Sequence, residues 1–323
     1  MTPPPGAAPG AGRYAPSPSG DLHLGNLRTA LLAWLLARST GRRFVLRIED
    51  LDRVRPGAAE RQLADLARLG LDWDGEPLLQ SAREPAHRAV VDRLTAAGRT
   101  YECYCTRREI QAAGSAPHGA PGAYPGTCRE LDDAERSRRR AQRPPAVRLR
   151  AEVRERTVVD RWAGAHTGLV DDFVLLRNDG RPAYNLAVVV DDAHQGVDQV
   201  VRGDDLLPST PRQAYLAAVL GLPEPRWAHV PLVLNPQGGR LAKRDGAVTL
   251  ADLAAAGQDA GEVVGRIGAS LGVSGPVRTA RDVLAGFDED ALPRAPWVVG
   301  PAGRDPGRLP HRRAGTSEPH RPC

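Results

Sequence analysis

The stretch of residues 13–52 constrains the fold of this 323-residue chain more than any other, because it sets a strand, a glycine turn, a helix and a second strand in order. Pro16 and Pro18 stiffen the first extended segment, and Gly20 allows a sharp turn before the helix. Apolar residues then recur at three- and four-residue spacing, as on a buried helix face: Leu24, Leu27, Leu31, Trp34 and Leu35. This order predicts a parallel sheet covered by helices.

Polar residues at the expected ends of these elements indicate a nucleotide site. The strand over 44–48 ends in Glu49 and Asp50, and open parallel sheets bind ligands at the carboxyl ends of their strands. His23 stands at the start of the helix, where unpaired N–H groups favour phosphate, and Gly25 leaves room for an adenine or a ribose. A lone histidine there can also be a solvent-facing cap, but the surrounding prolines and glycines favour the nucleotide site.

Two motifs carry a resemblance to a known family. A-P-S-P-S-G-D-L-H-L-G-N, followed by R-T-A-L, resembles the signature of class I aminoacyl-tRNA synthetases of the glutamyl and glutaminyl group, with H-L-G-N in the place of the "HIGH" motif. R-L-A-K-R stands where that group carries its "KMSKS" loop, with Arg240 for the first Lys and Ala242 for Ser. The resemblance covers about residues 12–275 and extends to Y-N-L-A-V-V-V-D-D, V-V-R-G-D-D-L and T-P-R-Q-A-Y-L.

The resemblance implies an α/β fold, namely a Rossmann-like class I synthetase catalytic domain with a zinc-binding insertion and a short helical C-terminal part. Periodicity adds expected helices over 56–69, 85–97 and 210–220, with shorter helical patterns in 250–273 and 276–299. Strands are expected over 173–176, 183–190, 199–202 and 230–234, the first two forming a hairpin around Asn178-Asp179-Gly180.

These patterns divide the chain into six expected segments. They are a disordered leader (1–11), the first half of the catalytic domain (12–100), a zinc-containing, Arg-rich insertion (101–165), the second half with the KMSKS-like loop (166–249), a short helical region (250–300) and a disordered tail (301–323). A full glutamyl-tRNA synthetase continues with an anticodon-binding region, which this chain is expected to lack.

Cys103, Cys105 and Cys128 suggest a metal site, because closely spaced cysteines in a cytosolic protein are more often ligands than a disulfide. Zinc takes four ligands in a tetrahedron, so one position remains. His118 is the ordinary chemical choice for it. The resemblance instead favours Tyr124, because a C-x-C…Y-x3-C set binds zinc in glutamyl-Q tRNA(Asp) synthetases. The alternative is three reduced cysteines without a metal.

The charge balance permits an RNA partner. Lys and Arg number 44 and Asp and Glu 39, which gives a net charge of +5. The run 136–156 is dense in arginine around 138–140, which is typical of a solvated helix face or of contact with a phosphate backbone. The resemblance favours the second, because this insertion corresponds to the acceptor-end-binding region of the family. No signal peptide or membrane span is recognisable, which predicts a cytoplasmic protein.

Lys243 is the only lysine of the chain, so the remaining 43 of the 44 cationic side chains are arginine. Arginine replaces lysine readily where a diffuse positive charge is enough. A lysine that persists in so arginine-rich a chain indicates a position that requires a compact ammonium on a flexible stem. Chance survival is the alternative.

The resemblance assigns roles to individual residues. His23 and Lys243 are catalytic: His23 stabilises the α/β-phosphate oxygens of ATP and Lys243 holds the departing pyrophosphate, with Mg²⁺ accompanying the nucleotide. ATP-binding residues are His23, Gly25, Asn26 and Lys243. Glutamate-binding residues are Arg13, Tyr14, Ala15, Pro16, Ser17, Glu49, Tyr184 and Arg202. The chemistry agrees, because Arg13 or Arg202 can bind a carboxylate in bidentate fashion and Glu49 can accept from an ammonium group.

Both signatures, the C-x-C…Y-x3-C insertion and the expected lack of an anticodon region resemble the glutamyl-Q tRNA(Asp) synthetase family. The resemblance implies a monomeric ligase that activates L-glutamate with ATP and transfers it to the queuosine base in the anticodon of tRNA(Asp). The alternatives are a truncated glutamyl-tRNA synthetase that acylates a tRNA 3′ end, a small-molecule nucleotidylyltransferase and a non-catalytic paralogue that binds RNA or nucleotide. The presence of both His23 and Lys243 disfavours the last of these.

Overall fold

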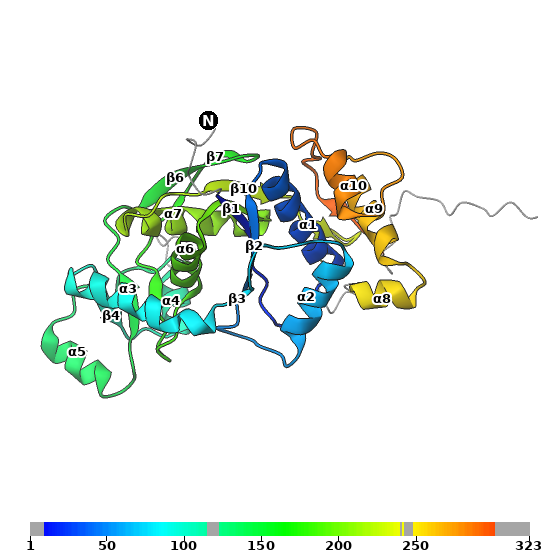
Figure 1. The fold of residues 1–323 in the computed structure, drawn as a ribbon. Helices are drawn as coiled ribbons and strands as arrows, with labels where there is room; N and C mark the ends of the chain where they lie inside the picture. Colours follow the sequence, from blue (N-terminus) through cyan, green and yellow to red (C-terminus); the bar gives the residue numbers. More distant parts are fainter. Residues whose placement is uncertain (1–9, 115–122, 240, 242–247, 301–323) are drawn as a thin grey trace, which may run out of the picture.

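A seven-stranded sheet forms the centre of the protein (Figure 1). The computed structural model describes residues 10–114, 123–239, 241 and 248–300. Neighbouring strands run parallel except at one edge, where β6 and β7 are antiparallel. The sheet order is β3 (Leu78–Leu79), β2 (Arg43–Ile48), β1 (Ala11–Tyr14), β9 (Val197–Gly203), β10 (Arg226–Val230), β6 (Glu155–Asp160) and β7 (Gly164–Leu169). The prediction of a Rossmann-like α/β fold is therefore confirmed.

Helices pack along this sheet and supply most of the core. Helix α1 contacts β1, β9 and β2, whereas α6 and α7 contact each other and pack on β9 and β6. Figure 1 shows α6 and α7 on one side of β1 and β2 and α1 on the other. The predicted apolar face of α1 is correct, because all five of its members are at most 2% exposed. The helices are α1 (Leu24–Ser39), α2 (Ala58–Arg68), α3 (Glu84–Ala96), α6 (Tyr184–Gln195) and α7 (Thr210–Val219), with 3₁₀ turns η1 (Ser81–Arg83) and η2 (Asp204–Ser209).

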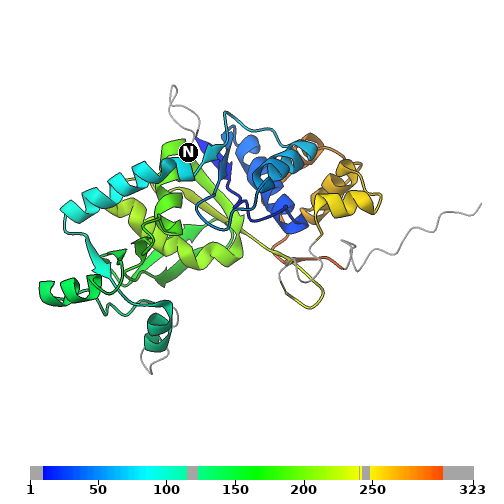
Figure 2. The same cartoon turned by 90° about the horizontal axis from the view of Figure 1, so that it is seen from below.

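A separate antiparallel sheet of three strands lies at one end of the molecule and carries the cysteines. It consists of β4 (Thr100–Cys103), β5 (Ala146–Leu149) and β8 (Val174–Leu176), accompanied by helices α4 (Arg107–Gly114) and α5 (Asp133–Arg140). Figure 2 shows α4 and α5 projecting away from the large sheet. Strand β8 was expected to resume the catalytic sheet, but it pairs with β5 instead.

The expected hairpin over 173–190 is wrong in its second strand. The turn forms as predicted, with Gly180 N–H donating to the Arg177 carbonyl at 2.8 Å, and Gly180 has a φ of 77°. The following segment is helix α6, which ends at Gly196 in the left-handed conformation that stops helices. The hairpin signal at Asn178-Asp179-Gly180 suggested a second strand, but packing of the buried helix overrides the β propensity of its three consecutive valines.

Three further boundaries differ from expectation. Ala11, assigned to the leader, is fully buried in β1, so the described chain is ordered from that strand onward. Strand β6, assigned to the insertion, pairs with β10 in the large sheet. The strand expected over 230–234 is divided, because β10 ends at Val230 and β11 (Val233–Leu234) pairs with β12 (Trp297–Val298). The six segment boundaries as a whole remain a prediction.

Short helices follow the catalytic sheet, as expected for 250–300: α8 (Leu250–Ala255), α9 (Ala260–Ser270) and α10 (Ala280–Ala285). Each begins with a capping box, which matters most in helices of this length. Arg28 of α1, only 1% exposed, joins them to the sheet by donating from Nε to Ser270 Oγ at 3.1 Å and from Nη1 to the Pro231 carbonyl at 2.7 Å. No helix among the described residues is long and apolar enough to cross a membrane.

Candidate active site and cysteine cluster

A cleft of about 570 Å³ lies where β1, β2 and β9 end beside the N-terminus of α1. Its lining includes every residue expected to bind glutamate: Arg13, Tyr14, Ala15, Pro16, Ser17, Glu49, Tyr184 and Arg202. It also includes three of the expected ATP-binding residues: His23, Gly25 and Asn26. Asp50, the other acid after β2, accepts from Ser81 N at 2.7 Å and from Ser81 Oγ at 2.5 Å instead. The structure thus brings together residues that are widely separated in the sequence.

His23 caps α1 and lines the cleft at the same time. Its Nδ1 accepts from Asn26 N–H at 3.3 Å, and Asn26 Oδ1 accepts from His23 N–H at 3.2 Å, which completes a capping box. Because Nδ1 accepts, the ring proton of a neutral imidazole is on Nε2. A Cβ at position 25 would approach the His23 ring to 3.1 Å. Gly25 therefore leaves space for the ring where it lies. His23 can therefore cap α1 through Nδ1 and also contact a ligand in the cleft.

The KMSKS-like loop begins and ends at this cleft. Leu241 lines the cleft, Val248 accepts from Leu24 N–H at 3.0 Å, and Thr249 forms a β-bridge with His23. Lys243, Arg240 and Ala242 themselves lie outside the described residues. The part of the chain that contains Lys243 is therefore anchored on both sides beside the helix N-terminus.

One carboxylate joins two arginines at the edge of the cleft. Asp192 Oδ1 accepts from Arg47 Nη1 at 2.7 Å and from Arg13 Nε at 3.4 Å. Arg47 in turn donates from Nη2 to Glu49 Oε1 at 3.2 Å, and Arg13 Nη1 donates to the Val201 carbonyl at 3.0 Å. Burial raises the pKa of Glu49, and the charges of Arg47 and Arg13 oppose that rise. The network orients a carboxylate and a guanidinium toward the same cleft.

Arg202 of β9 also lines the cleft and is buried, with only 5% exposure. It donates from Nε to His229 Nε2 at 3.0 Å, from Nη1 to Gln213 Oε1 at 2.8 Å and from Nη2 to Thr210 Oγ1 at 3.0 Å. The Tyr184 hydroxyl lies 3.4 Å from Nη1. Burial lowers the pKa of Arg202 because it penalises the charged form. The cleft therefore offers cationic groups for carboxylates, an acidic group for an ammonium and a helix N-terminus for phosphate.

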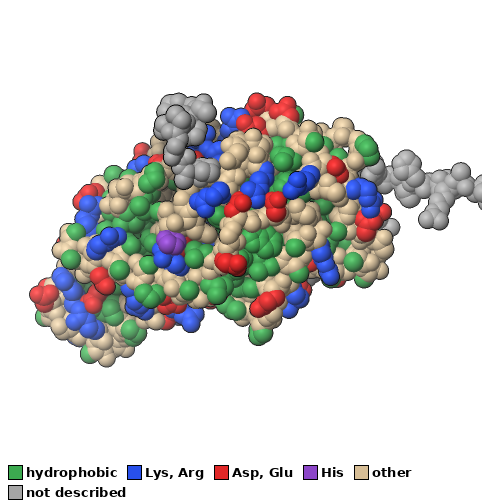
Figure 3. All heavy atoms as spheres, in the orientation of Figure 1, with side chains coloured by type: hydrophobic (Ala, Val, Ile, Leu, Met, Phe, Trp, Pro, Cys, Tyr) green, Lys and Arg blue, Asp and Glu red, His purple; other side chains and the backbone are tan. Residues whose placement is uncertain are grey.

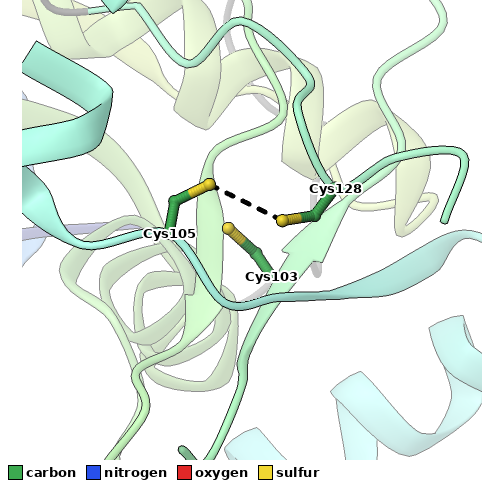
Figure 4. A group of neighbouring side chains, drawn as sticks. All are labelled: Cys103, Cys105 and Cys128. Atoms are coloured by element: carbon green, nitrogen blue, oxygen red, sulfur yellow. Dashed lines mark hydrogen bonds between the residues drawn. The ribbon is translucent and has the colours of Figure 1, made fainter. Parts of the chain in front are cut away.

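The three cysteines form the second candidate site (Figure 4). Their sulfur atoms all lie within 4.8 Å of one another, with Cys105 Sγ and Cys128 Sγ 3.5 Å apart. The Tyr124 hydroxyl is 3.4 Å from Cys103 Sγ and 3.8 Å from Cys105 Sγ, and it accepts from Cys128 N–H at 2.8 Å. Ligands about 2.3 Å from a tetrahedral zinc stand roughly 3.8 Å apart, so this donor set fits that metal. His118 lies outside the described residues.

Several arginines of the run 136–156 form ion pairs with acidic side chains of the protein itself. Arg138 and Arg139 both pair with Glu135, and Arg140 pairs with Glu102 at 2.5 Å. Figure 3 shows cationic and acidic side chains interspersed over one face of the molecule. Contact of this run with RNA therefore stays a prediction.

Comparison with known proteins identifies the family. Residues 11–271 match the family described as tRNA synthetases class I (E and Q), catalytic domain. The chain is 68% identical to the glutamyl-Q tRNA(Asp) synthetase of Nocardia farcinica (strain IFM 10152), over 90% of this chain and 93% of the relative. The chain belongs to the glutamyl-Q tRNA(Asp) synthetase family. The recognition of this family, which rested on the two signatures, the C-x-C…Y-x3-C insertion and the expected lack of an anticodon region, is confirmed.

Other relatives agree with this membership. The glutamyl-Q tRNA(Asp) synthetase of Symbiobacterium thermophilum is 50% identical, over 88% of this chain and 94% of the relative. Glutamate–tRNA ligase 1 of Methylobacterium radiotolerans is 46% identical, over 73% of this chain and 51% of the ligase. The crystal structure of a glutamate tRNA ligase from Elizabethkingia meningosepticum is 27% identical with a TM-score of 0.78, covering 90% of this chain and 67% of that chain. The class I synthetase fold is confirmed.

Sequence reasoning missed the residues that hold the cleft arginines in place. These are Asp192, Arg47, Asp160, His229 and Gln213. One signal was available, because Arg47 stands in a strand of otherwise buried apolar residues, and a buried guanidinium requires partners. Asp192 and Gln213 stand in two of the segments that carry the resemblance, but nothing in the sequence showed which side chains they contact. Asp160 and His229 lie outside those segments, and no local pattern indicates them.

Proposed function

We propose that this protein activates L-glutamate with ATP to form glutamyl-adenylate, and then transfers the glutamyl group to the queuosine base in the anticodon of tRNA(Asp). The observation that carries the proposal is the single cleft that combines buried arginines, Glu49 and the capped N-terminus of α1. Relatives named for this activity that match nearly the full chain give it further support.

Glutamate binding in this proposal uses the charges of the cleft. Arg13 and Arg202 would bind carboxylates of the amino acid, and Glu49 would accept from its ammonium group. Tyr184, whose hydroxyl lies 3.4 Å from Arg202, would complete the wall beside the side chain. Tyr14, Ala15, Pro16 and Ser17 would contribute the backbone and side chains that follow β1.

Activation requires no side-chain nucleophile. The glutamate α-carboxylate attacks the α-phosphate of ATP, and the bond to the departing pyrophosphate breaks, so positioning and charge stabilisation supply the catalysis. His23 Nε2–H and Asn26 at the start of α1 would stabilise phosphate oxygens, and Lys243 would hold the pyrophosphate. Mg²⁺ bound with ATP would neutralise phosphate charge. A hydroxyl of the queuosine cyclopentenediol then attacks the activated carbonyl, and AMP leaves.

The first test is glutamate-dependent exchange between ATP and pyrophosphate with the purified protein and no RNA. We expect exchange with glutamate, and none with glutamine or aspartate. Glutamine lacks the side-chain carboxylate that the cleft cations would bind, and the carboxylate of aspartate is one methylene closer to its α-carbon. The second step is tested with radiolabelled glutamate and tRNA(Asp), with and without queuosine. Equal labelling of both RNAs, or labelling of tRNA(Glu) at its 3′ end, would contradict the proposed acceptor and favour a truncated glutamyl-tRNA synthetase.

The proposal includes one structural zinc ion held by Cys103, Cys105, Cys128 and Tyr124. The four donor atoms lie close enough to surround one ion, and three cysteine sulfurs are the ligand type that zinc prefers in structural sites. Such an ion would stabilise a polar loop that buries little apolar surface. A cytoplasmic location and a monomeric state are further predictions.

We expect the purified protein to contain about one zinc per chain, and Cys128→Ser to lose it together with the stability of the small sheet. Tyr124→Phe removes only the hydroxyl and should release zinc to a chelator faster. His118→Ala is the matched control for the fourth ligand and should retain zinc as well as the wild type. Metal content by mass spectrometry and thermal unfolding measure these effects. Loss of zinc from His118→Ala, with zinc retained in Tyr124→Phe as in the wild type, would overturn the assignment.

A further inference from the structure

We infer that Asp160, His229 and Gln213 are positioning residues that hold Arg202 with its charge unpaired until a carboxylate of the amino-acid substrate arrives. The inference rests on the proposed function and specifies how one side of the glutamate site is built. None of these three residues lines the cleft. They act through Arg202, which does.

The hydrogen-bond partners of Arg202 are all uncharged groups. Side-chain acceptors around the guanidinium are an imidazole, an amide and hydroxyl groups, all of them uncharged. The Leu206 carbonyl lies 3.5 Å from Nη2 and is also uncharged. No carboxylate among the described residues forms an ion pair with Arg202, in contrast to Arg13 and Arg47, which share Asp192. The carboxylates of Asp192 and Glu49 favour the charged form of Arg202 without forming an ion pair with it. A buried cation without a direct ion pair is costly, so an anionic ligand that forms one is favoured.

The contacts of His229 determine its tautomer. A guanidinium nitrogen can only donate, so His229 Nε2 must accept from Arg202, and the ring proton is then on Nδ1. That proton is donated to Asp160 Oδ2 at 2.7 Å, and the same oxygen accepts from His229 N–H at 3.0 Å. Asp160 Oδ1 accepts from the N–H groups of Trp162 at 3.0 Å and Ala163 at 2.9 Å. Asp160 is therefore fixed by backbone groups and fixes the ring in turn.

The charges around His229 favour the neutral acceptor that Arg202 requires. Burial is the largest cause that lowers the pKa of His229, and the charges of Arg202 and Arg13 lower it further. Asp160 opposes them. Thr210 Oγ1 on α7 lies 3.2 Å from Nε2, and Trp227 stacks on the ring at 6.4 Å between centroids, so both neighbours are uncharged.

Gln213 allows a negative charge to be placed beside Arg202 at almost constant side-chain shape. Gln213 is 1% exposed, and its Nε2 donates to Asn185 Oδ1 at 3.0 Å. A glutamate at this position would present a carboxylate oxygen to Arg202 Nη1, where the amide oxygen now lies at 2.8 Å. The Asn185 amide can rotate to donate to the new carboxylate. Gln213→Glu therefore supplies the counter-ion that the substrate would otherwise provide.

The test compares the wild type with Gln213→Glu and His229→Asn in pyrophosphate exchange and in calorimetric titration with L-glutamate. Asparagine can reach Asp160 from the position of Nδ1 but cannot replace the Nε2 acceptor. We expect both variants to raise the KM and Kd for glutamate about tenfold or more, with the KM for ATP unchanged. His87→Asn is the matched control, because His87 is equally buried, pairs with Asp191 at 2.9 Å and does not line the cleft.

The outcomes separate the inference from the proposed function. If the wild type neither binds nor activates glutamate, the proposed function fails. If the wild type activates glutamate and both Gln213→Glu and His229→Asn keep its glutamate KM, the inference is wrong. A rise in glutamate KM in His87→Asn equal to that in His229→Asn would also overturn it, because loss of a buried histidine would then suffice. Thermal unfolding of each variant establishes that the measured protein is folded.

Discussion

Replacement of His23 by asparagine is expected to reduce glutamate-dependent pyrophosphate exchange by about 10²–10³-fold while leaving α1 intact. Asparagine is among the best N-cap residues, so its side-chain oxygen can take over the bond that Nδ1 now accepts from Asn26 N–H. The substitution removes Nε2, which carries the ring proton and takes no part in the cap. The variant thereby separates the structural role of His23 from its proposed contact with phosphate.

The measurement is the exchange rate at saturating glutamate and ATP, with thermal unfolding recorded on the same samples. His23→Ala is the companion variant, because alanine removes both the cap and the phosphate contact. It should show a similar loss of exchange and a further loss of about 1 kcal/mol in stability. Exchange by His23→Asn close to the wild-type rate would mean that His23 is only a cap.

Lys243→Arg is expected to reduce the same exchange reaction by at least about 10²-fold, although it preserves the positive charge. The ammonium of lysine is a compact point charge with three donors, whereas a planar guanidinium needs a wider site and a different approach to the phosphate oxygens. Leu241 lines the cleft and Val248 accepts from Leu24 N–H at 3.0 Å, so the described residues on both sides of the loop lie near the N-terminus of α1. The role of Lys243 in binding pyrophosphate is the proposal that this variant tests.

Arg240→Lys is the matched control for this loop, because it makes the opposite exchange at the first position of the same signature. We expect it to keep most of the exchange activity, since lysine is the usual residue at this position of the family signature. Full activity in Lys243→Arg would remove the role assigned to Lys243. Loss in both variants would mean that the loop, and not one ammonium group, determines the rate.

The sequence predicted the parts of the site that are defined by local order. His23 follows a glycine turn and begins a helix, and Glu49 follows a buried strand, so both positions at the sheet edge could be deduced from neighbouring residues. The resemblance added Arg13, Tyr184 and Arg202, and all of them line the cleft. Motif and periodicity therefore located the cleft well.

What the sequence did not reveal depends on contacts between distant segments. Arg13 and Asp192 are 179 positions apart, and Asp160 and His229 are 69 apart, so no spacing rule relates them. The same limit explains the error at 183–190, where the hairpin signal at Asn178-Asp179-Gly180 suggested a strand. Whether such a segment becomes a helix or a strand is determined by the surface it packs against, and here α7 and β9 provide that surface for a helix.

Arg28 couples the position of α1 to that of the C-terminal helices. It lies on the same helix as His23, and its guanidinium fastens that helix to Ser270 at the end of α9 and to the backbone after β10. A shift of the C-terminal helices would therefore pull on the helix whose first turn faces the proposed phosphates. The short helices after the catalytic sheet are thus joined through one buried guanidinium to the same helix whose N-terminus lines the cleft.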